Sequence, residues 1–390
     1  MKKTQLMVAL ATLGFAGSAL ATNGYFSHGY GMKASGMAGA STTNTEDTFF
    51  GANNPAAAAY VGNRIDLGAS VFSPIRETSM TGTGLTIESD QNYFPVPEFG
   101  YNRMLNPDLA LGVTVYANGG MNTNYPSNPG TTTNMFGGSG RLGVDLMQVV
   151  IAPTVAYKLA PNHSVGISPL VAYQRFKADG LDGIFGPQTS ENDDSFGYGV
   201  RVGYLGKITP TVTFGAAYAT KMEMDEFDKY NWLFLESGDF DMPENYNIGV
   251  SWQASPAVRL VLDYQRINYS DVRSVGAPQT AGGFGWDDMD IWKLGVEYKY
   301  NKQLILRAGY SHADSPIKSE DVTFNILAPA VVEDHASVGF TYTLASGNEL
   351  TVAYTHVLEN EVSGPNLFGA GTDRIQMYEN QVGVQYSWKM

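Results

Sequence analysis

The sequence predicts an all-β fold, a closed antiparallel barrel of fourteen transmembrane strands with an N-terminal hatch, or plug, inside the lumen. Three observations support this prediction: apolar and polar residues alternate with a period of two, charged residues are few, and connections alternate between short and long. Only 16% of the 390 residues are charged, compared with about 25% in soluble domains. Beyond residue 20 the chain has no run of about 18 apolar residues, which a membrane helix needs. Strands are therefore the elements expected to cross a membrane.

The alternation is clearest in three segments, residues 195–207, 245–253 and 381–388. In the first segment the even positions are apolar or aromatic, namely Phe196, Tyr198, Val200, Val202 and Tyr204. The odd positions from 195 to 203 are small or polar. Tyr and Trp stand at the ends of such runs, as in the aromatic girdles at the two membrane interfaces. Each segment is expected to have one face toward lipid and the other toward a wet lumen.

The expected strands are joined by short and long connections in turn. We expect strands at 65–72, 92–102, 109–118, 144–158, 163–175, 195–208, 211–221, 244–254, 257–267, 288–300, 303–312, 334–345, 348–358 and 379–389. The short connections are at Asn106-Pro107, Pro161-Asn162, Thr209-Pro210, Ser255-Pro256, Asn301-Lys302 and Ser346-Gly347, and the long ones are at about 73–91, 119–143, 176–194, 222–243, 268–287, 313–333 and 359–378. Bacterial barrels sort their loops in this way, whereas a soluble sandwich has no reason to do so. Because backbone groups in hydrocarbon must all be paired, the last strand is expected to pair with the first.

The chain divides into three parts. Residues 1–21 begin with Lys2 and Lys3, continue with an apolar stretch and end in Ala19-Leu20-Ala21, which is typical of a secretory signal peptide. Residues 22–64 are rich in small and polar residues without alternation, and we expect them to form the hatch; a disordered periplasmic tail is the alternative. Residues 65–390 form the expected barrel. A secreted barrel of this kind belongs in the outer membrane of a Gram-negative cell.

Charge and motifs exclude several classes of function. Removal of the signal peptide takes away two of 24 basic residues, so 22 basic and 38 acidic residues give a net charge of 22 − 38 = −16. Nucleic acid is thus not an expected partner. The chain has no cysteine, its five histidines have no metal-ligand spacing, and no G-x-S-x-G, G-x-G-x-x-G or P-loop occurs. We expect no catalytic residues, no metal site and no cofactor, although a hydrolase at the outer rim using His312 or His356 is an alternative.

One small-residue segment and one short motif carry a family resemblance. Gly29-Tyr30-Gly31-Met32-Lys33-Ala34-Ser35-Gly36-Met37-Ala38-Gly39-Ala40 is followed by Asn54-Pro55-Ala56-Ala57 directly before the first expected strand. Together they resemble the FadL family of outer-membrane transporters for hydrophobic compounds. The resemblance implies a hatch-closed barrel that takes up long-chain fatty acids or aromatic hydrocarbons and needs no cofactor. A closed barrel needs no partner strand, so a monomer is expected.

In the family, cargo is captured at outer loops, passes to a site above the hatch and leaves sideways through the wall. The resemblance places the hatch motif at Asn54, Pro55 and Ala56. A lateral opening is expected at Asn118, Gly119 and Gly120, because glycine weakens the strand ladder and allows a bulge. The alternative is that this glycine pair only begins a loop.

Two outer loops are unusually apolar. Their candidate substrate-binding residues are Leu181, Ile184, Phe185, Phe227, Trp232, Leu233, Phe234 and Leu235. The resemblance implies that these loops form the outer capture groove, where each buried methylene of a ligand contributes about 0.8 kcal/mol. Alternatively, these side chains pack the loops onto one another.

Charged residues leave further alternatives open. Arg201, Arg259 and Arg307 are expected in the lumen, where an arginine could bind a fatty-acid carboxylate or pair with lumen acids and the hatch. Acidic runs in the outer loops could bridge divalent ions to lipopolysaccharide or form a solvated surface. The expected partners are a hydrophobic small molecule, outer-membrane lipid and lipopolysaccharide. A structural or adhesive barrel that binds surface ligands is the alternative function.

Overall fold

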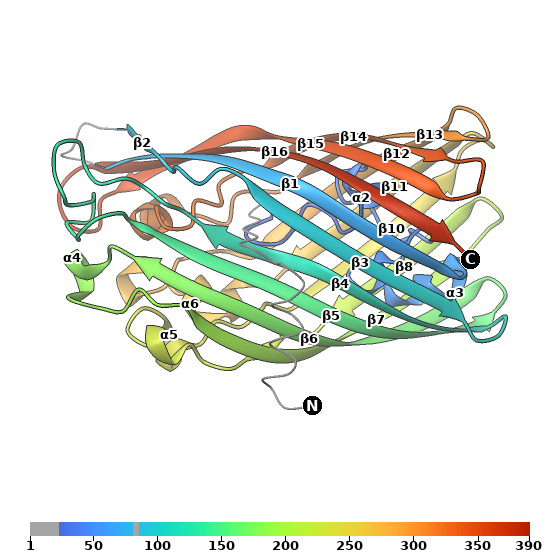
Figure 1. Cartoon of the computed structure of the whole chain (residues 1–390), viewed down its shortest axis with the longest axis horizontal. Helices are drawn as coiled ribbons and strands as arrows, with labels where there is room; N and C mark the ends of the chain where they lie inside the picture. Colours follow the sequence, from blue (N-terminus) through green and yellow to red (C-terminus); the bar gives the residue numbers. More distant parts are fainter. Residues whose placement is uncertain (1–22, 81–85) are drawn as a thin grey trace.

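The computed structural model describes residues 23–80 and 86–390, so the expected signal peptide, residues 1–21, lies outside the described residues. Fourteen strands form the wall: β1 (Arg64–Ser79), β3 (Phe94–Met104), β4 (Leu109–Asn122), β5 (Gly143–Ala160), β6 (His163–Asp179), β7 (Asp193–Lys207), β8 (Val212–Ala219), β10 (Asn245–Gln253), β11 (Val258–Ile267), β12 (Met289–Lys299), β13 (Leu304–His312), β14 (Asp334–Thr343), β15 (Glu349–Pro365) and β16 (Thr372–Lys389). Two short strands, β2 (Thr86–Glu88) and β9 (Glu223–Met224), lie in the long connections. Figure 1 shows the strands inclined to the long axis, with the long connections at the left end.

The barrel is closed by its first and last strands. Each wall strand pairs with the next one antiparallel, and β16 pairs with β1 from Lys389–Arg64 to Arg374–Ser79. The sheet therefore has no free first or last strand, whose unpaired backbone groups would be costly in hydrocarbon. The prediction of a closed fourteen-stranded barrel is confirmed.

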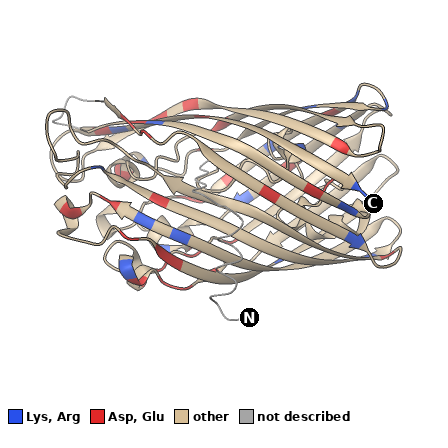
Figure 2. Cartoon of the chain, viewed as in Figure 1, with Lys and Arg blue, Asp and Glu red and all other residues tan. Residues whose placement is uncertain are grey.

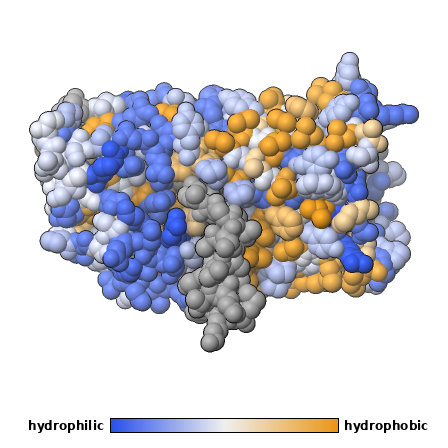
Figure 3. Space-filling model, viewed as in Figure 1, coloured by the Kyte–Doolittle hydropathy of each residue, from blue (hydrophilic) through white to orange (hydrophobic). Residues whose placement is uncertain are grey.

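Apolar side chains on the wall point outward, as the alternation predicts. Tyr198 and Val202 are exposed on the outer face of β7, whereas Arg201 between them is buried on the lumen side. Figure 3 shows hydrophobic residues gathered over the half of the barrel that ends in the short turns, and hydrophilic residues over the other half. The apolar band therefore covers only part of the length of the strands.

Several strands extend beyond the ranges expected from the sequence. The first strand, expected at 65–72, continues to Ser79, and most of the long loop expected at 359–378 is instead strand, leaving only residues 366–371 as a connection. These extensions lie beyond the apolar band, where the outer face meets water and does not need apolar residues. Pairing continues there while the alternation of hydrophobicity is lost. Pro74 within β1 also argued against a strand there, because proline is rare in the interior of a sheet.

Residues 23–63, called the N-terminal segment below, lie inside the lumen. The segment contains α2 (Met32–Ser35), η1 (Phe49–Gly51), η2 (Pro55–Ala57) and α3 (Ala58–Val61), and most of its side chains are buried. Its main chain is held by inward-facing side chains of strands around the barrel, including Asp66 of β1, Thr114 of β4, Asp263 of β11 and Gln385 of β16. Figure 1 shows α2 among the strands and α3 at the right-hand end of the barrel, near the C-terminus.

The long connections form an apolar cap on the end of the barrel opposite the short turns. They contain α4 (Asp182–Phe185), η3 (Asp228–Tyr230), α5 (Leu235–Gly238), η4 (Tyr269–Asp271), α6 (Arg273–Gly276), η5 (Gln279–Ala281), η6 (Ser319–Asp321) and α7 (Val322–Asn325). Apolar residues of these loops pack together with Tyr25 and Phe26 of the N-terminal segment in one cluster. Among the described residues, no helix has both the length and the apolar character needed to cross a membrane.

Candidate functional site

An apolar groove opens among the long connections. It has a volume of about 590 Å³. Six of the eight candidate substrate-binding residues line it: Ile184, Phe185, Trp232, Leu233, Phe234 and Leu235. The rings of Phe185 and Trp232, from different loops, have centroids 5.1 Å apart. Phe324 and Phe368 complete the groove from two further connections.

The other two candidate residues do not line this groove. Leu181 and Phe227 are buried, and both belong to the apolar cluster beneath the groove. Phe176 connects this cluster to the groove, because its ring centroid lies 5.7 Å from that of Phe227 and 4.7 Å from that of Phe234. Leu181 and Phe227 therefore support the floor of the groove.

The apolar cluster continues from the groove into the barrel through a series of aromatic contacts. The ring centroids of Phe234 and Phe240 are 4.9 Å apart, and those of Phe240 and Tyr25 are 5.9 Å apart. Tyr25 in turn lies 5.8 Å from Trp286. The N-terminal segment is thus in apolar contact with the floor of the outer groove.

A small pocket lies at the inner end of this series. Its apolar walls include Phe72, Met121, Trp286 and Met377, and Arg76 contributes its guanidinium. The free volume of about 10 Å³ is enough for about one water molecule. A larger molecule can enter only if neighbouring side chains or the N-terminal segment move.

Arg76 is the charged group of this pocket and is buried. Its guanidinium donates hydrogen bonds to the main-chain carbonyls of Asn122 and Gln91 and to the side-chain oxygen of Asn92, and it lies 5.7 Å from the ring centroid of Phe94. None of these hydrogen bonds within the described residues is to a carboxylate. Arg76 was not among the residues expected in the lumen, because the expected strand ended at residue 72. Continuing the inward-facing even positions from 64 to 72 would have placed residue 76 in the lumen.

Two of the three arginines expected to be able to bind a cargo carboxylate, Arg259 and Arg307, already form ion pairs within the protein. Arg307 lies 2.8 Å from both Glu46 and Glu297, and Arg259 lies 3.0 Å from both. Burial alone would raise the pKa of the Glu46 carboxyl, but Arg259 and Arg307 hold that pKa below its usual value. These arginines therefore fix the N-terminal segment to β11 and β13.

Arg201, the third candidate, also contacts the N-terminal segment. Its guanidinium donates to the carbonyl oxygen of Asn53 at 3.4 Å and to the side-chain oxygen of Asn245 at 3.2 Å. All three candidate arginines thus contact the N-terminal segment, and each has polar partners within the protein.

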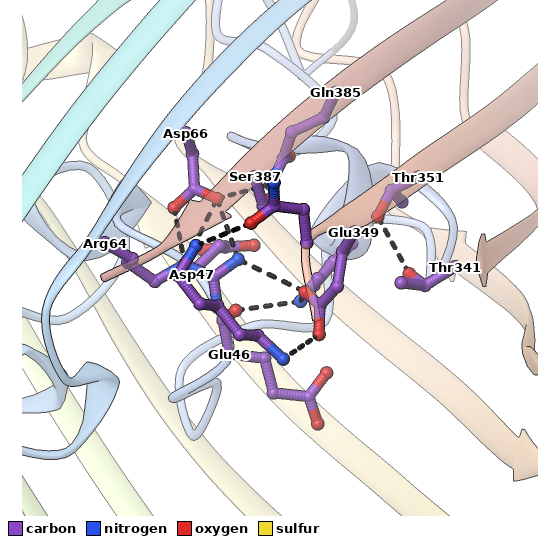
Figure 4. A network of polar contacts seen from close by, with 12 residues as sticks. Glu46, Asp47, Arg64, Asp66, Thr341, Glu349, Thr351, Gln385 and Ser387 are labelled. Carbon is purple, nitrogen blue, oxygen red and sulfur yellow. Dashed lines mark hydrogen bonds and ion pairs between the residues drawn. The ribbon is translucent and has the colours of Figure 1, made fainter. Parts of the chain in front are cut away.

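A second polar network holds the other side of the N-terminal segment (Figure 4). The Lys33 ammonium lies 2.7 Å from Glu349, which also lies 3.2 Å from Arg64. Arg64 lies 2.8 Å from Asp66. Asp66 accepts hydrogen bonds from the main-chain N–H and hydroxyl of Thr48 at 2.8 and 2.7 Å. Buried charges are tolerated here because each has charged or hydrogen-bonding partners.

The Asn-Pro-Ala motif fixes the end of the N-terminal segment nearest the first strand. The Asn54 side chain accepts a hydrogen bond from the Ala56 N–H at 3.1 Å, which caps η2, and donates to the carbonyls of Thr42 and Tyr204 at 2.9 and 3.0 Å. A side chain at Gly203 of β7 would overlap Asn54. The motif therefore requires a close approach of the segment to the wall.

The pairing of β3 with β4 stops partway along the strands. It runs from Met104–Ala110 to Phe99–Val115, although β3 continues to Phe94 and β4 to Asn122. We call this unpaired stretch the β3–β4 break. Here Phe72, Phe94, Val96 and Ala117 form a separate apolar cluster.

The candidate residues Asn118, Gly119 and Gly120 pair with the N-terminal segment at the break. The Ser27 N–H donates to the Asn118 carbonyl at 3.1 Å, and the Gly120 N–H donates to the Tyr25 carbonyl at 3.2 Å. The register with β5 shifts between Ala117 and Gly119, which is a bulge. A Cβ atom at Gly119 would overlap the Tyr25 carbonyl, so only glycine permits this approach.

The lumen on the short-turn side of the N-terminal segment is polar. A cavity of about 330 Å³ lies there. Its polar lining residues include Thr43, Thr45, Lys207, Thr213, Ser251, Gln253 and Arg259. The apolar path from the groove is therefore not continued toward the short turns.

Comparison with known proteins decides the family. Residues 7–374 match the family described as outer membrane protein transport protein (OMPP1/FadL/TodX). The chain belongs to this family. The resemblance seen in the sequence is thus confirmed, and the protein is an outer-membrane transport protein for hydrophobic compounds, not an enzyme. No curated protein matches the chain.

Solved structures of family members share the fold. The Pseudomonas putida toluene transporter TodX has 19% sequence identity and a TM-score of 0.73, with coverage of 93% of this chain and 99% of TodX. A Pseudomonas aeruginosa FadL homologue has 15% identity and a TM-score of 0.72, covering 96% and 100%. The Ralstonia pickettii toluene transporter TbuX has 17% identity and a TM-score of 0.69, covering 93% and 99%. At such identities the likeness shows the fold alone.

Proposed function

We propose that this protein takes up hydrophobic molecules by capture in the outer groove, passage along the apolar cluster and lateral release into the membrane at the β3–β4 break. The observation that carries the proposal is the continuity of apolar side chains. They extend from Phe185 and Trp232 in the groove, through Tyr25 and Trp286, to Phe72. Phe72 also belongs to the cluster at the break. An apolar molecule on this route is never returned to water.

The polar lumen beyond the N-terminal segment favours lateral release over passage straight into the periplasm. Each methylene that left the apolar cluster for the polar cavity would lose about 0.8 kcal/mol of burial. Exit through the break instead delivers the molecule from apolar side chains into hydrocarbon. The charged networks around Glu46 and Glu349 would also have to be opened on the straight route.

We infer that residues 22–64 act as the hatch. Tyr25 and Phe26 belong to the apolar cluster, and their main chain pairs with β4 at the break. The nearly filled pocket beside Arg76 requires that cargo displace something as it enters. Displacement of Tyr25 and Phe26 would enlarge the pocket and free β4 in one movement. The cargo itself would thus open its exit.

Arg76 favours a carboxylate-bearing cargo, such as a long-chain fatty acid, over a neutral aromatic hydrocarbon. The hydrogen bonds of the buried Arg76 guanidinium go to neutral oxygens, although the buried Glu379 carboxylate interacts with its charge. A cargo carboxylate would accept two parallel hydrogen bonds from it. The apolar walls would hold the acyl chain. Neutral aromatic cargo, as named for TodX and TbuX, would accept no such pair of hydrogen bonds. The protein would act as a monomer surrounded by outer-membrane lipid and lipopolysaccharide.

Reconstituted liposomes test the proposal. Entry of labelled oleate is measured for the parent protein, for a variant lacking residues 22–56 and for Phe185→Ala/Trp232→Ala. Tyr298→Ala/Tyr300→Ala, an aromatic pair on the outer wall, is the matched control. Transport predicts oleate flux that the deletion changes and the groove variant lowers, while the control equals the parent. An adhesive barrel would give no flux in any variant, and a hydrolase would give product without flux; either result contradicts the proposal.

A further inference from the structure

A buried acid, Glu379 of β16, lies beside the Arg76 pocket. Its side chain is fully buried, and neither of its carboxyl oxygens has a hydrogen-bond partner among the described residues. Glu379 stands directly opposite Pro74, which lines the pocket and is two residues before Arg76 on β1. Glu379 and Arg76 are therefore diagonal neighbours on the lumen face of two adjacent strands.

The imidazole of His28, in the N-terminal segment, lies against this acid. Its Nε2 atom is 3.5 Å from Glu379, and its ring centroid is 6.1 Å from that of Phe72, which also lines the pocket. Neither ring nitrogen of His28 has a hydrogen-bond partner among the described residues. Burial, His335 and Lys293 lower the pKa of His28 well below its usual value. The imidazole is therefore neutral and offers one acceptor nitrogen.

Lys293 and His335 are the other titratable groups that face His28. Lys293 of β12 lies directly opposite Asp263 of β11, whose charge balances it. The ring centroid of His335, on β14, is 5.0 Å from that of His28. A proton added to His28 would lie close to the Lys293 charge, so His28 does not supply a counter-charge for the neighbouring acid.

Arg76 has one buried acid near it among the described residues. Its charge interacts with Tyr125, Glu379 and Glu88. Tyr125 is a phenol and is neutral near pH 7, and Glu88 is exposed, so water and salt screen its charge. Figure 2 shows that charged residues are widely spaced along the strands that face the viewer. Without cargo, Arg76 and Glu379 therefore balance each other as one buried cation and one buried anion.

A cargo carboxylate at Arg76 changes this balance. It would place a second negative charge beside a single guanidinium, in a pocket with apolar walls. Two neighbouring carboxylates in such a site cannot both stay ionised, so one of them takes up a proton. Glu379 in its protonated form can donate a hydrogen bond to the neutral imidazole of His28, whereas Arg76 favours the ionised form of the cargo. The proton is therefore expected on Glu379 while cargo is bound.

We propose that Glu379 and His28 form a proton site, which takes up a proton from water when an acidic cargo binds at Arg76 and gives this proton to the cargo as it leaves. On exit the O–H bond of Glu379 breaks and an O–H bond forms on the cargo carboxylate. The cargo enters the membrane as a neutral acid, and Glu379 is again a carboxylate beside Arg76. An ionised carboxylate is costly to transfer into hydrocarbon, and the proton removes this cost. This role rests on the proposed function, because it requires an acidic cargo at Arg76.

Calorimetric titration in buffers of different ionisation enthalpy tests the proton site, because it measures the protons taken up per ligand bound. Oleate, oleyl sulfate and oleyl alcohol are titrated into the detergent-solubilised protein at pH 8, and titration into detergent alone corrects for protonation of oleate in micelles. Oleyl sulfate is an anion that cannot itself hold a proton at this pH. The expected uptake is about one proton for each anion bound and none for the alcohol. Binding of either anion without proton uptake, or uptake with the alcohol, would overturn the proposal.

A matched pair of variants assigns the proton to its side chain. Glu379→Gln keeps the shape of the side chain but cannot take up the proton, so oleyl sulfate should bind to it without proton uptake. Glu361→Gln, which removes a partly exposed ion pair with Arg374, should behave as the parent. Uptake that persists in Glu379→Gln, or that is lost equally in both variants, would contradict the assignment. Failure of the parent to bind oleate would contradict the proposed function, whereas binding without proton uptake would contradict only the proton site.

Discussion

The buried ammonium group of Lys33, in the N-terminal segment, donates a 2.7 Å hydrogen bond to the carboxylate of Glu349 on β15. Arg64 shares the same carboxylate at 3.2 Å. Removing one partner from such a buried group costs about 3–5 kcal/mol because a charge is left uncompensated. Glu349 is therefore one of the wall side chains that hold the N-terminal segment in the lumen, and among the described residues it is the only wall partner of the Lys33 ammonium.

Glu349→Gln is expected to loosen the N-terminal segment without opening the barrel. A loss of about 3 kcal/mol corresponds to local opening that is about 100-fold more frequent. Hydrogen exchange of residues 32–48 in detergent micelles should accelerate accordingly, while exchange of the strands stays slow. Glu361→Gln is the control, because the pair of Glu361 with Arg374 is partly exposed and such pairs contribute about 0–1 kcal/mol. Equal exchange in the two variants would show that the Lys33–Glu349 pair does not hold the N-terminal segment in place.

Arg76→Met is expected to weaken carboxylate binding selectively. Hydrogen bonds to charged groups contribute about 1.5–3 kcal/mol, so the affinity for oleate should fall about 10- to 100-fold. The affinity for toluene should stay unchanged. Arg76→Lys keeps the charge but not the planar fork and should give an intermediate loss. Calorimetric titration of the detergent-solubilised protein measures both ligands, and an equal loss for both would show that Arg76 has only a structural role.

The outer loop that contains Asp239 is expected to loosen as the pH rises through about 7. Burial and the neighbouring Asp241 raise the pKa of Asp239 to about 7, whereas an unfolded aspartate has a pKa of about 3.9. The folded loop therefore favours the protonated acid. Its stabilising contribution is complete below pH about 4 and is lost as the pH rises through about 7.

Hydrogen exchange of residues 226–242, corrected for the intrinsic effect of pH, measures this dependence. Protection should be greater at pH 6 than at pH 8 in the parent protein. Asp239→Asn should remove the difference, because an amide does not titrate in this range. Protection that increases with pH in the parent would contradict the assigned sign.

The strand number and closure could be predicted because lipid imposes the same requirement on every strand. Each lipid-facing position must be apolar, and this produces a pattern that a single sequence displays. Outside the hydrocarbon the requirement ends, so the extension of β1 to Ser79 and the inward position of Arg76 could not be seen in the alternation.

The groove could be predicted in part from the sequence, because apolar residues such as Phe185 and Trp232 are unusual in outer loops. Which of these residues line the groove and which form its floor could not be predicted, since this depends on five connections packing together. No local sequence pattern predicts the contacts between the N-terminal segment and the wall in the lumen. Met32 donates its N–H to Gln385, more than 350 positions away in the chain, and such pairings follow only from the closed wall.

The glycine at position 119 offers the sharpest test of the coupling between hatch and wall. Its main chain forms a bridge with Phe26, and any Cβ atom there would overlap the Tyr25 carbonyl. Gly119→Ala is therefore expected to detach Tyr25 and Phe26 from β4 while β4 keeps its pairing with β5. Hydrogen exchange of residues 23–30 should accelerate, and exchange of residues 109–115 should not.

Gly369→Ala is the matched control, because a Cβ atom at Gly369 would meet no neighbouring atom within 4 Å. The two variants add the same methyl group, one at the β3–β4 break and one in an outer turn. If displacement of Tyr25 and Phe26 opens the exit, Gly119→Ala should raise the rate of oleate entry into liposomes and Gly369→Ala should not. Faster exchange of residues 23–30 without a change in oleate entry would separate the movement of the segment from the release of cargo, and it would disprove the coupling.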